Sequence, residues 1–244
     1  MVFKIGKPEL DDPRRRMLVQ ALSVSAAGLL LPGTSMAQGF LGRRRLPEGK
    51  SIFSLSGNVT VNGAAATTDT RIKPGDVIET GPSSAIIFAI EGRAMIVRAN
   101  SRLELEGGDG VGSTILAGLR LLTGKLLSVS RSARTQLRTQ TATIGIRGTG
   151  WYAESDPEQT YFCTCYGATD IAANDDPSST LSVAASHHDR PVYILSNAGA
   201  GRSIRDAPFI NHTDQELMLI ESIVGREPPF VFPGDDYGGP RRDY

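Results

Sequence analysis

The stretch that decides the fold class is Ser101–Glu106, which reads SRLELE. Polar and apolar residues alternate strictly in it, and because successive side chains of a β-strand point to opposite faces, it predicts a strand with one face in water. Short apolar runs separated by turns precede it, at Val77–Thr80, Ala85–Ile90 and Ala94–Val97. Helical spacing of apolar residues is absent between residues 52 and 171, so this region predicts an all-β domain.

The turns favour the same class. The dipeptide Asn62-Gly63 follows the apolar run Val59–Val61, and it predicts a tight hairpin because both of its positions tolerate a positive φ. Pro74–Asp76 marks another turn, and Leu119–Val129 carries two apolar stretches around Thr123-Gly124. With 27 glycines and 14 prolines among 244 residues, the chain turns often, as sheet proteins do.

A helical pattern is found only near the C-terminus. Thr213–Glu216 has the form of a capping box, in which the first and fourth residues satisfy each other's backbone N–H groups. Leu217 and Ile220 follow at helical spacing, and Gly225 stands where a left-handed cap is expected. This predicts one short α-helix over residues 213–224 whose apolar stripe packs on the β domain.

Four blocks of the chain resemble the FecR domain family. They are Gly57–Gly63, Ile72–Gly81, Asn100–Leu105 and Thr139–Thr149, in the family's order. The last block opens a hairpin in the family, and here its return strand would be Thr160–Ile171. The resemblance covers residues 52–172 and implies an antiparallel β domain, a sandwich or a roll.

The resemblance also implies a role. FecR-like domains are extracytoplasmic modules used for sensing and protein contact, not for catalysis, and the founding type relays a signal to a sigma factor. Here only about 13 residues precede the first apolar run, where that type has cytoplasmic regulatory helices, so a sigma-regulating role is not expected. The partner implied is another protein of the cell envelope.

The N-terminus predicts export. Arg14–Arg16 precede an apolar run that ends at Leu31, and the small residues Ser35 and Ala37 follow. This resembles a cleaved twin-arginine signal peptide over residues 1–37, an ordinary secretory signal being the alternative. The mature protein is then expected in the periplasm or at the cell surface and does not span a membrane.

The remaining chain divides by composition. We expect a linker over 38–51, the FecR-like domain over 52–172, a β-hairpin extension and the C-terminal helix over 173–227, and a disordered tail over 228–244. Lysine and arginine number 26, as do aspartate and glutamate, and this balance argues against nucleic acid as a partner.

Cys163 and Cys165 are the two cysteines of the chain. Residues two apart on a strand face the same side, so both sulfur atoms would project together. Their α-carbons would lie about 6.6 Å apart with parallel side chains, which is poor geometry for a disulfide. Two parallel thiols can bind one metal ion more easily.

Imidazoles lie downstream of the cysteines. His187 and His188 occupy a predicted turn between the strand candidates Thr180–Ala185 and Val192–Leu195. Adjacent histidines on a regular strand point to opposite faces, so both can bind one ion only if the turn bends the chain. Thiolates and imidazoles suit zinc, copper or iron. The candidate metal ligands are therefore Cys163, Cys165, His187 and His188, with His212 as a replacement for one of them.

Two other interpretations of these residues stay open. An oxidising compartment favours a strained or solvent-facing disulfide. Alternatively, the cysteines are two small apolar side chains in a core, and the histidines are solvated on a turn. The sequence has neither a Gly-x-Ser-x-Gly nucleophile elbow nor a His-Glu-x-x-His zinc-protease motif. We therefore expect a non-catalytic interaction or sensing module, with a transition-metal-binding protein as the alternative function.

Overall fold

The structure is a computed structural model that describes residues 45–108, 115–131 and 134–230. The predicted export signal lies outside the described residues, as do 38–44 of the predicted linker and 231–244 of the predicted tail. Within the described part, no helix has the length and apolar character needed to cross a membrane.

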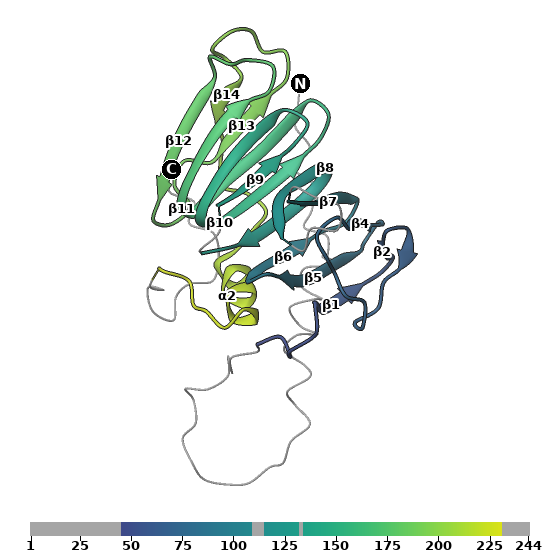
Figure 1. Ribbon diagram of the computed structural model, residues 1–244. Coiled ribbons are helices and arrows are strands. Elements are labelled where there is room, and N and C mark those ends of the chain that lie inside the picture. The colour runs from purple at the N-terminus through teal and green to yellow at the C-terminus, as the bar shows by residue number, and fades with distance from the viewer. Residues whose placement is uncertain (1–44, 109–114, 132–133, 231–244) are drawn as a thin grey trace, which may run out of the picture. The chain divides into compact units, whose positions relative to one another are not determined.

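The described residues form strands and one short helix, which confirms the predicted all-β class with a C-terminal helix (Figure 1). Their bounds are β1 Ile52–Ser56, β2 Val59–Val61, β3 Ala64–Ala65, β4 Val77–Thr80, β5 Ala85–Ile90, β6 Arg93–Val97, β7 Ser101–Gly107, β8 Leu116–Val129, β9 Arg134–Arg138, β10 Ala142–Ser155, β11 Gln159–Ala173, β12 Thr180–Ala185, β13 Val192–Leu195, β14 Ile204–Asp206 and α2 Asp214–Ile223.

These strands belong to one hydrogen-bonded sheet with 14 members. The main path runs β14-β13-β11-β10-β9-β8-β7-β4-β2-β3. Off this path, β12 pairs with β11, and β1 pairs with β5, which reaches β8 through β6. The strands of the predicted hairpin extension thus continue the same sheet as those of the FecR-like region.

The expected antiparallel arrangement has one exception among the described strands. β8 and β10 pair antiparallel where Gly124–Val129 faces Gly150–Ser155. Toward the other end of both strands β9 lies between them, antiparallel to β10 and parallel to β8. The parallel pair follows from this insertion, because a strand between two antiparallel neighbours must run with one of them.

Local signals in the sequence produce the local structure. Asn62 and Gly63 have φ of 53° and 79°, and they join β2 to β3 as the hairpin signal predicts. β10 and β11 form the predicted hairpin over residues 142–173. The two apolar stretches at 119–129 form one long strand, β8, whose pairing with β7 shifts register between Thr123 and Leu121.

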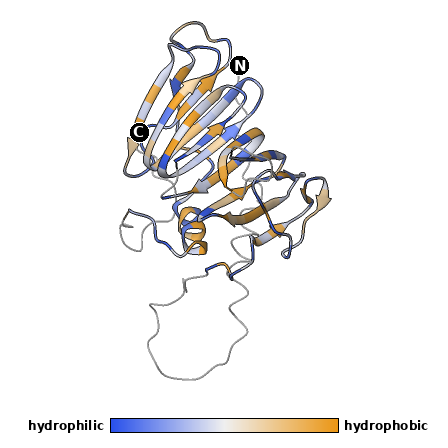
Figure 2. Ribbon diagram, in the orientation of Figure 1, coloured by the Kyte–Doolittle hydropathy of each residue, from blue (hydrophilic) through white to orange (hydrophobic). Residues whose placement is uncertain are grey.

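The hydrophobic core lies on one face of the long hairpin. Trp151 and Ala153 of β10 and Phe162 of β11 belong to it, together with side chains from β4 to β8 such as Leu103 and Ile86. Polar residues occupy the alternate positions of strands such as β7, which is the alternation that Figure 2 shows as neighbouring orange and pale or blue stretches.

The other face of the hairpin is covered by residues 207–230, here called the C-terminal segment. Tyr152 stacks on His212 with ring centroids 4.5 Å apart, and the backbone N–H of Ile210 donates to the hydroxyl of Tyr161 at 3.3 Å. Tyr152 and Tyr161 are buried even though they alternate with core residues along β10 and β11. The hairpin is therefore buried on both faces over residues 150–153 and 160–166.

Helix α2 lies within the C-terminal segment and begins as its capping box predicts. The hydroxyl of Thr213 accepts from the backbone N–H of Glu216, and the carboxylate of Glu216 accepts from the backbone N–H of Thr213. Leu217 and Ile220 are fully buried, and Gly225 has a φ of 73° after the last turn. The predicted helix over 213–224 is confirmed.

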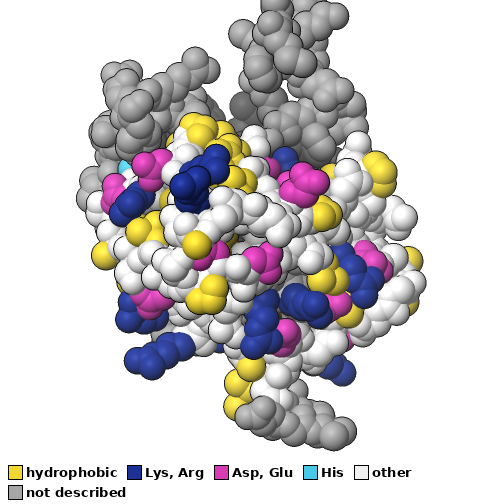
Figure 3. Space-filling view, turned by 90° about the horizontal axis from the view of Figure 1, so that it is seen from above, with side chains coloured by type: hydrophobic (Ala, Val, Ile, Leu, Met, Phe, Trp, Pro, Cys, Tyr) yellow, Lys and Arg dark blue, Asp and Glu magenta, His cyan; other side chains and the backbone are white. Residues whose placement is uncertain are grey.

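Charged side chains lie on the solvent face of the sheet in cross-strand pairs. Arg102 pairs with Glu79 at 2.7 Å, and Arg138 pairs with Glu106 at 3.1 Å. Figure 3 shows basic and acidic side chains interspersed on the face that it displays. The first pair joins the neighbouring strands β4 and β7, and the second reaches from β9 to β7 across β8, so the outer positions of these strands carry complementary charges.

Candidate metal centre

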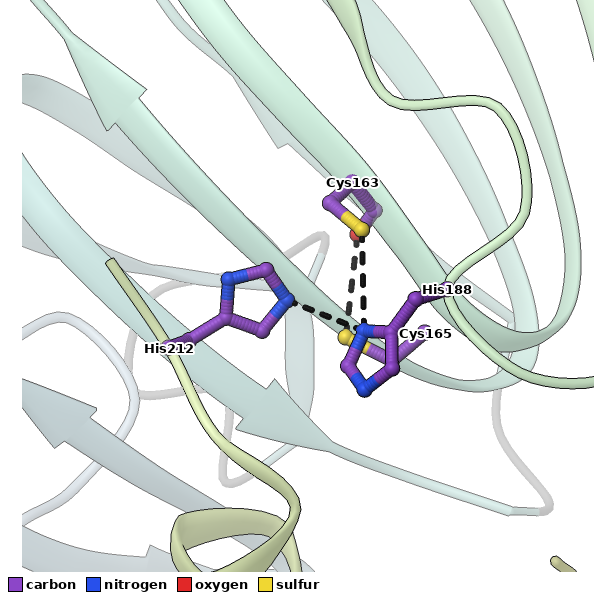
Figure 4. Close-up of side chains that lie close together, drawn as sticks. All are labelled: Cys163, Cys165, His188 and His212. Carbon is purple, nitrogen blue, oxygen red and sulfur yellow. Dashed lines mark hydrogen bonds between the residues drawn. The ribbon is translucent and has the colours of Figure 1, made fainter. Parts of the chain in front are cut away.

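Four donor side chains from three parts of the chain meet under the C-terminal segment. Cys163 and Cys165 project together from β11, His188 lies in the turn after β12, and His212 lies two residues before α2 (Figure 4). One ligand atom from each of the four lies within 4.8 Å of the others. Their relative exposures are 0%, 0%, 3% and 1%, so the cluster is closed to solvent.

The turn that carries His188 is fixed to β11 at the cluster itself. The backbone N–H of His188 donates to the carbonyl of Cys165 at 2.8 Å. His188 has a φ of 53°, a left-handed conformation that is costly for a residue with a β-carbon. This bend points the His188 ring inward, where Nδ1 lies 3.8 Å from the Sγ of Cys163 and 3.1 Å from the Nε2 of His212.

Hydrogen bonds on the outer side of each ring determine which nitrogen carries the proton. His188 Nε2 lies 2.7 Å from Oδ1 of Asp214, and His212 Nδ1 lies 2.7 Å from the carbonyl oxygen of Ile210. Carboxylate and carbonyl oxygens only accept, so both of these nitrogens donate. The lone pairs of His188 Nδ1 and His212 Nε2 then face each other, and a positive charge between them is required to remove their repulsion.

The environment of the cysteines also favours a positive charge at the centre of the cluster. Burial would raise the pKa of the Cys163 thiol, but its hydrogen bonds to Cys165, His188 and His212 outweigh burial and hold this pKa well below the ordinary value. Burial and the neighbouring Cys163 raise the pKa of Cys165 well above its ordinary value. One thiolate thus forms readily, and a positive charge is needed before the second can form.

His188 already attracts positive charge. Burial alone would lower its pKa, but hydrogen bonds to Asp214 and Cys163 outweigh burial and raise the pKa to about 9. Without an ion, a proton occupies the space between the facing nitrogens. A metal ion would occupy the same space with a larger charge and would bind all four donors.

The spacing of the donors fits a tetrahedral ion. With metal–nitrogen bonds of about 2.0–2.1 Å and metal–sulfur bonds of about 2.3 Å, two nitrogens lie about 3.3 Å apart and sulfur lies about 3.6 Å from nitrogen. The corresponding distances here are 3.1 Å and 3.8 Å. Two cysteines and two histidines form a donor set that zinc prefers, and Cu(I) and iron also accept soft sulfur ligands.

His187, one of the predicted ligands, lies outside this group of four. Its Nε2 is 3.0 Å from both carboxylate oxygens of Asp214, and its side chain is 28% exposed. Its ring packs against Phe230, with centroids 4.6 Å apart. The structure therefore brings together Cys163, Cys165 and His188 of the predicted set, and His212 takes the place of His187.

Asp214 is the residue of the candidate site that the sequence did not indicate. It is the first residue of α2, where the helix dipole favours a negative charge, and only 2% of it is exposed. Its carboxylate orients His188 in the way that outer carboxylates orient histidine ligands in metal sites. The capping box predicts its place in the helix, but no pattern in the sequence links it to a turn 26 residues earlier.

Two buried charge networks include residues of α2. Arg98, which directly follows β6, pairs with Glu216 at 2.8 Å and donates to the hydroxyl of Tyr152 at 3.0 Å. Glu221, which is fully buried, pairs with Arg226 at 2.6 Å and accepts from the hydroxyl of Tyr166. Each acidic partner lies on α2, so the helix position is set by charge as well as by apolar packing.

Comparison with known proteins gives partial structural similarity only. No family model matches the chain, and no curated protein matches it. Two crystal structures of a "putative anti-sigma factor" from Parabacteroides distasonis ATCC 8503, at 1.65 Å and 2.50 Å resolution, are similar in backbone arrangement, each with 12% sequence identity. Their TM-scores are 0.42 and 0.41, and each match covers 54% of this chain. The match spans 58% of the length of the anti-sigma factor chain.

Proposed function

We propose that this protein is a non-catalytic β module that binds one transition-metal ion, zinc by preference, at Cys163, Cys165, His188 and His212. The observation that carries the proposal is the orientation of the two imidazoles. Each donates its outer N–H to an oxygen of the C-terminal segment and directs its inner nitrogen at the other ring and at the cysteines. Two facing lone pairs repel each other when no positive charge lies between them, and the same arrangement is favourable around a cation.

The closed geometry supports a structural or sensing role over a catalytic one. Catalytic zinc sites keep three protein ligands and leave the fourth position to water or substrate. Here four buried protein donors would supply all four ligands of a tetrahedral ion. An ion bound in this way has no position at which a substrate could coordinate.

The ion would connect the sheet to the C-terminal segment. Two of its ligands belong to β11, and a third, His188, is bonded to β11 through its backbone. The fourth, His212, belongs to the segment. Metal-binding free energy therefore adds to the free energy with which the segment is held on the sheet.

We also propose that the mature protein acts outside the cytoplasm by contacting another envelope protein. The support is the N-terminal arginine pattern and the resemblance of four sequence blocks to FecR domains, all four of which fall on strands and turns of the sheet. Replacing Arg14 and Arg15 by lysine should leave uncleaved precursor in the cytoplasm. Unchanged export of the double variant would reject the twin-arginine route.

Metal analysis beside a thiol titration tests the metal site. Protein purified from its exporting host should contain a near-stoichiometric transition metal, and both thiols should react only after a chelator is added. Cys163→Ser and His212→Ala should lose the metal, and a chelator should then no longer lower the melting temperature.

Val183→Ala is the matched control, since Val183 is a buried core residue of β12 that lies outside the donor set. It should lower the melting temperature while keeping both the metal and the effect of the chelator. The proposal would be rejected if the wild-type protein contained no metal and if Cys163→Ser changed neither the stability nor the thiol reactivity of Cys165.

A further inference from the structure

The four-donor centre has no opening to solvent, because every one of its residues is at most 3% exposed. An ion can reach it only through a neighbouring group that solvent can touch. His187 is the histidine in that position: it is 28% exposed and adjoins His188 in the chain.

His187, Asp214 and His188 form a second cluster of donors, whose ligand atoms also lie within 4.8 Å of one another. The Asp214 carboxylate lies 3.0 Å from His187 Nε2 and 2.7 Å from His188 Nε2. We call these three residues the outer cluster. His188 belongs to both groups, with Nε2 toward the outer cluster and Nδ1 toward the buried centre.

The donors therefore form a continuous series from the surface to the interior. It starts at His187, passes through the carboxylate of Asp214 and the ring of His188, and ends at Cys163. No two successive donor groups in this series are more than 3.8 Å apart. An ion held at the outer end of this series would therefore lie beside the His188 ring, whose inner nitrogen belongs to the buried centre.

We propose that the outer cluster is an entry site for a divalent cation on its way to the buried centre. This inference rests on the proposed metal site. The incoming ion binds the carboxylate of Asp214 and the lone pair of His187 Nε2, whose proton passes to Nδ1 of the same ring, and water fills its other positions. It then exchanges these ligands for the inner nitrogens and sulfurs, and each thiol proton that it displaces leaves to water.

The outer cluster is suited to passage and not to permanent binding. Of its three groups, His188 donates through Nε2 to Asp214 and cannot bind the ion there, which leaves the ion His187 and the Asp214 carboxylate. The centre offers four donors, and His188 binds through Nδ1 while its Nε2 keeps the hydrogen bond to Asp214. The larger number of ligands makes the centre the stable site.

Metal-exchange kinetics test the entry site. Chelator-treated protein is mixed with zinc, and loading is followed by the loss of free zinc to an absorbing zinc indicator; release is followed after excess chelator is added. His187→Ala should slow both loading and release by about tenfold while final zinc content matches wild type, because the ion loses its first ligand but keeps all four inner donors.

Arg190→Gln is the control from the same turn, since Arg190 is exposed and also has a positive φ of 52°. It removes a positive charge, so any electrostatic effect on cation entry would be an acceleration. Unchanged rates in His187→Ala would overturn the entry site, and so would complete loss of zinc, which would make His187 a permanent ligand. Wild-type protein that takes up no zinc would instead reject the metal site itself, so the two failures are distinguishable.

Discussion

Over residues 150–153 and 160–166, the two faces of the β10–β11 hairpin are buried by different means. One face packs Trp151 and Phe162 into the hydrophobic core, and the other holds tyrosines, cysteines and charged partners beneath the C-terminal segment. Apolar burial is non-directional and independent of solution conditions such as metal content. The contacts of the second face depend on protons, ions and fixed geometry. The first face therefore maintains the fold, whereas the second can respond to its surroundings.

A cavity in the core face should cause the largest loss in the free energy of unfolding. Phe162→Ala should lower the free energy of unfolding by about 3–5 kcal/mol, because Phe162 is 1% exposed and its removal leaves a void. Urea denaturation with saturating zinc and with a chelator measures the loss. An equal loss in both conditions would show that the core face does not depend on the metal. A loss that appears only with zinc would contradict that independence.

Metal removal should act next in size and on the other face. At a free zinc concentration about 100-fold above its dissociation constant, bound zinc contributes about 3 kcal/mol, which a chelator would remove. Hydrogen exchange should then speed up in the C-terminal segment and remain slow in β7, whose residues pack in the core. Equal acceleration in both regions would show that the ion supports the whole fold and that the two faces are not separate.

Loss of the outer carboxylate should have a smaller effect. Asp214→Asn keeps the size of the side chain but removes the charge that orients His188, and zinc affinity should fall about 10–100-fold. Competition with a chelator of known affinity measures it. The control is Asp189→Asn, in the turn that carries His188. The Asp189 carboxylate accepts from backbone N–H groups and a serine hydroxyl of that turn, so this change should leave the affinity near wild type. An equal loss in both variants would mean that turn geometry, and not the carboxylate on His188, sets the affinity.

The smallest effect is expected in loops away from both faces. The Asp176 carboxylate accepts hydrogen bonds from Ser178, Ser179, Gly201 and Ser203. The bonds from the Ser178 and Ser179 hydroxyls are the main reason that the pKa of Asp176 is well below the ordinary value. A lowered folded-state pKa contributes stability above the unfolded pKa of about 4, and this stability is lost as pH falls below it.

The difference in melting temperature between wild type and Asp176→Asn should therefore be present at neutral pH and shrink on acidification. The metal content of the variant should not change. A difference that grows as pH falls would contradict the lowered pKa.

The features that the sequence predicted are local ones. The alternation in β7, the hairpin at Asn62-Gly63 and the capping box at Thr213 are each written within a few residues, and the structure contains all three. The insertion of β9 between two longer strands could not be predicted, because it depends on where β8 and β10 diverge in space.

The candidate site was predictable to a similar extent. Cys163 and Cys165 share a face because of strand geometry, so their pairing follows from the sequence. The choice of His212 over His187 depends on the left-handed turn at His188 and on how the C-terminal segment lies on β11. The contact of Asp214 with His188 depends on the same packing and could not be predicted, since the two residues are distant in the chain.

The start of the described chain meets the end of α2. The backbone N–H of Leu46 donates to the carbonyl of Ile223 at 2.9 Å, before any strand has begun. Tension applied at residue 45 would therefore act on the last turn of α2 first, and through that helix on His212 and the buried donors. If the protein is tethered through its N-terminal side, mechanical load and metal binding would compete for the same short stretch of chain.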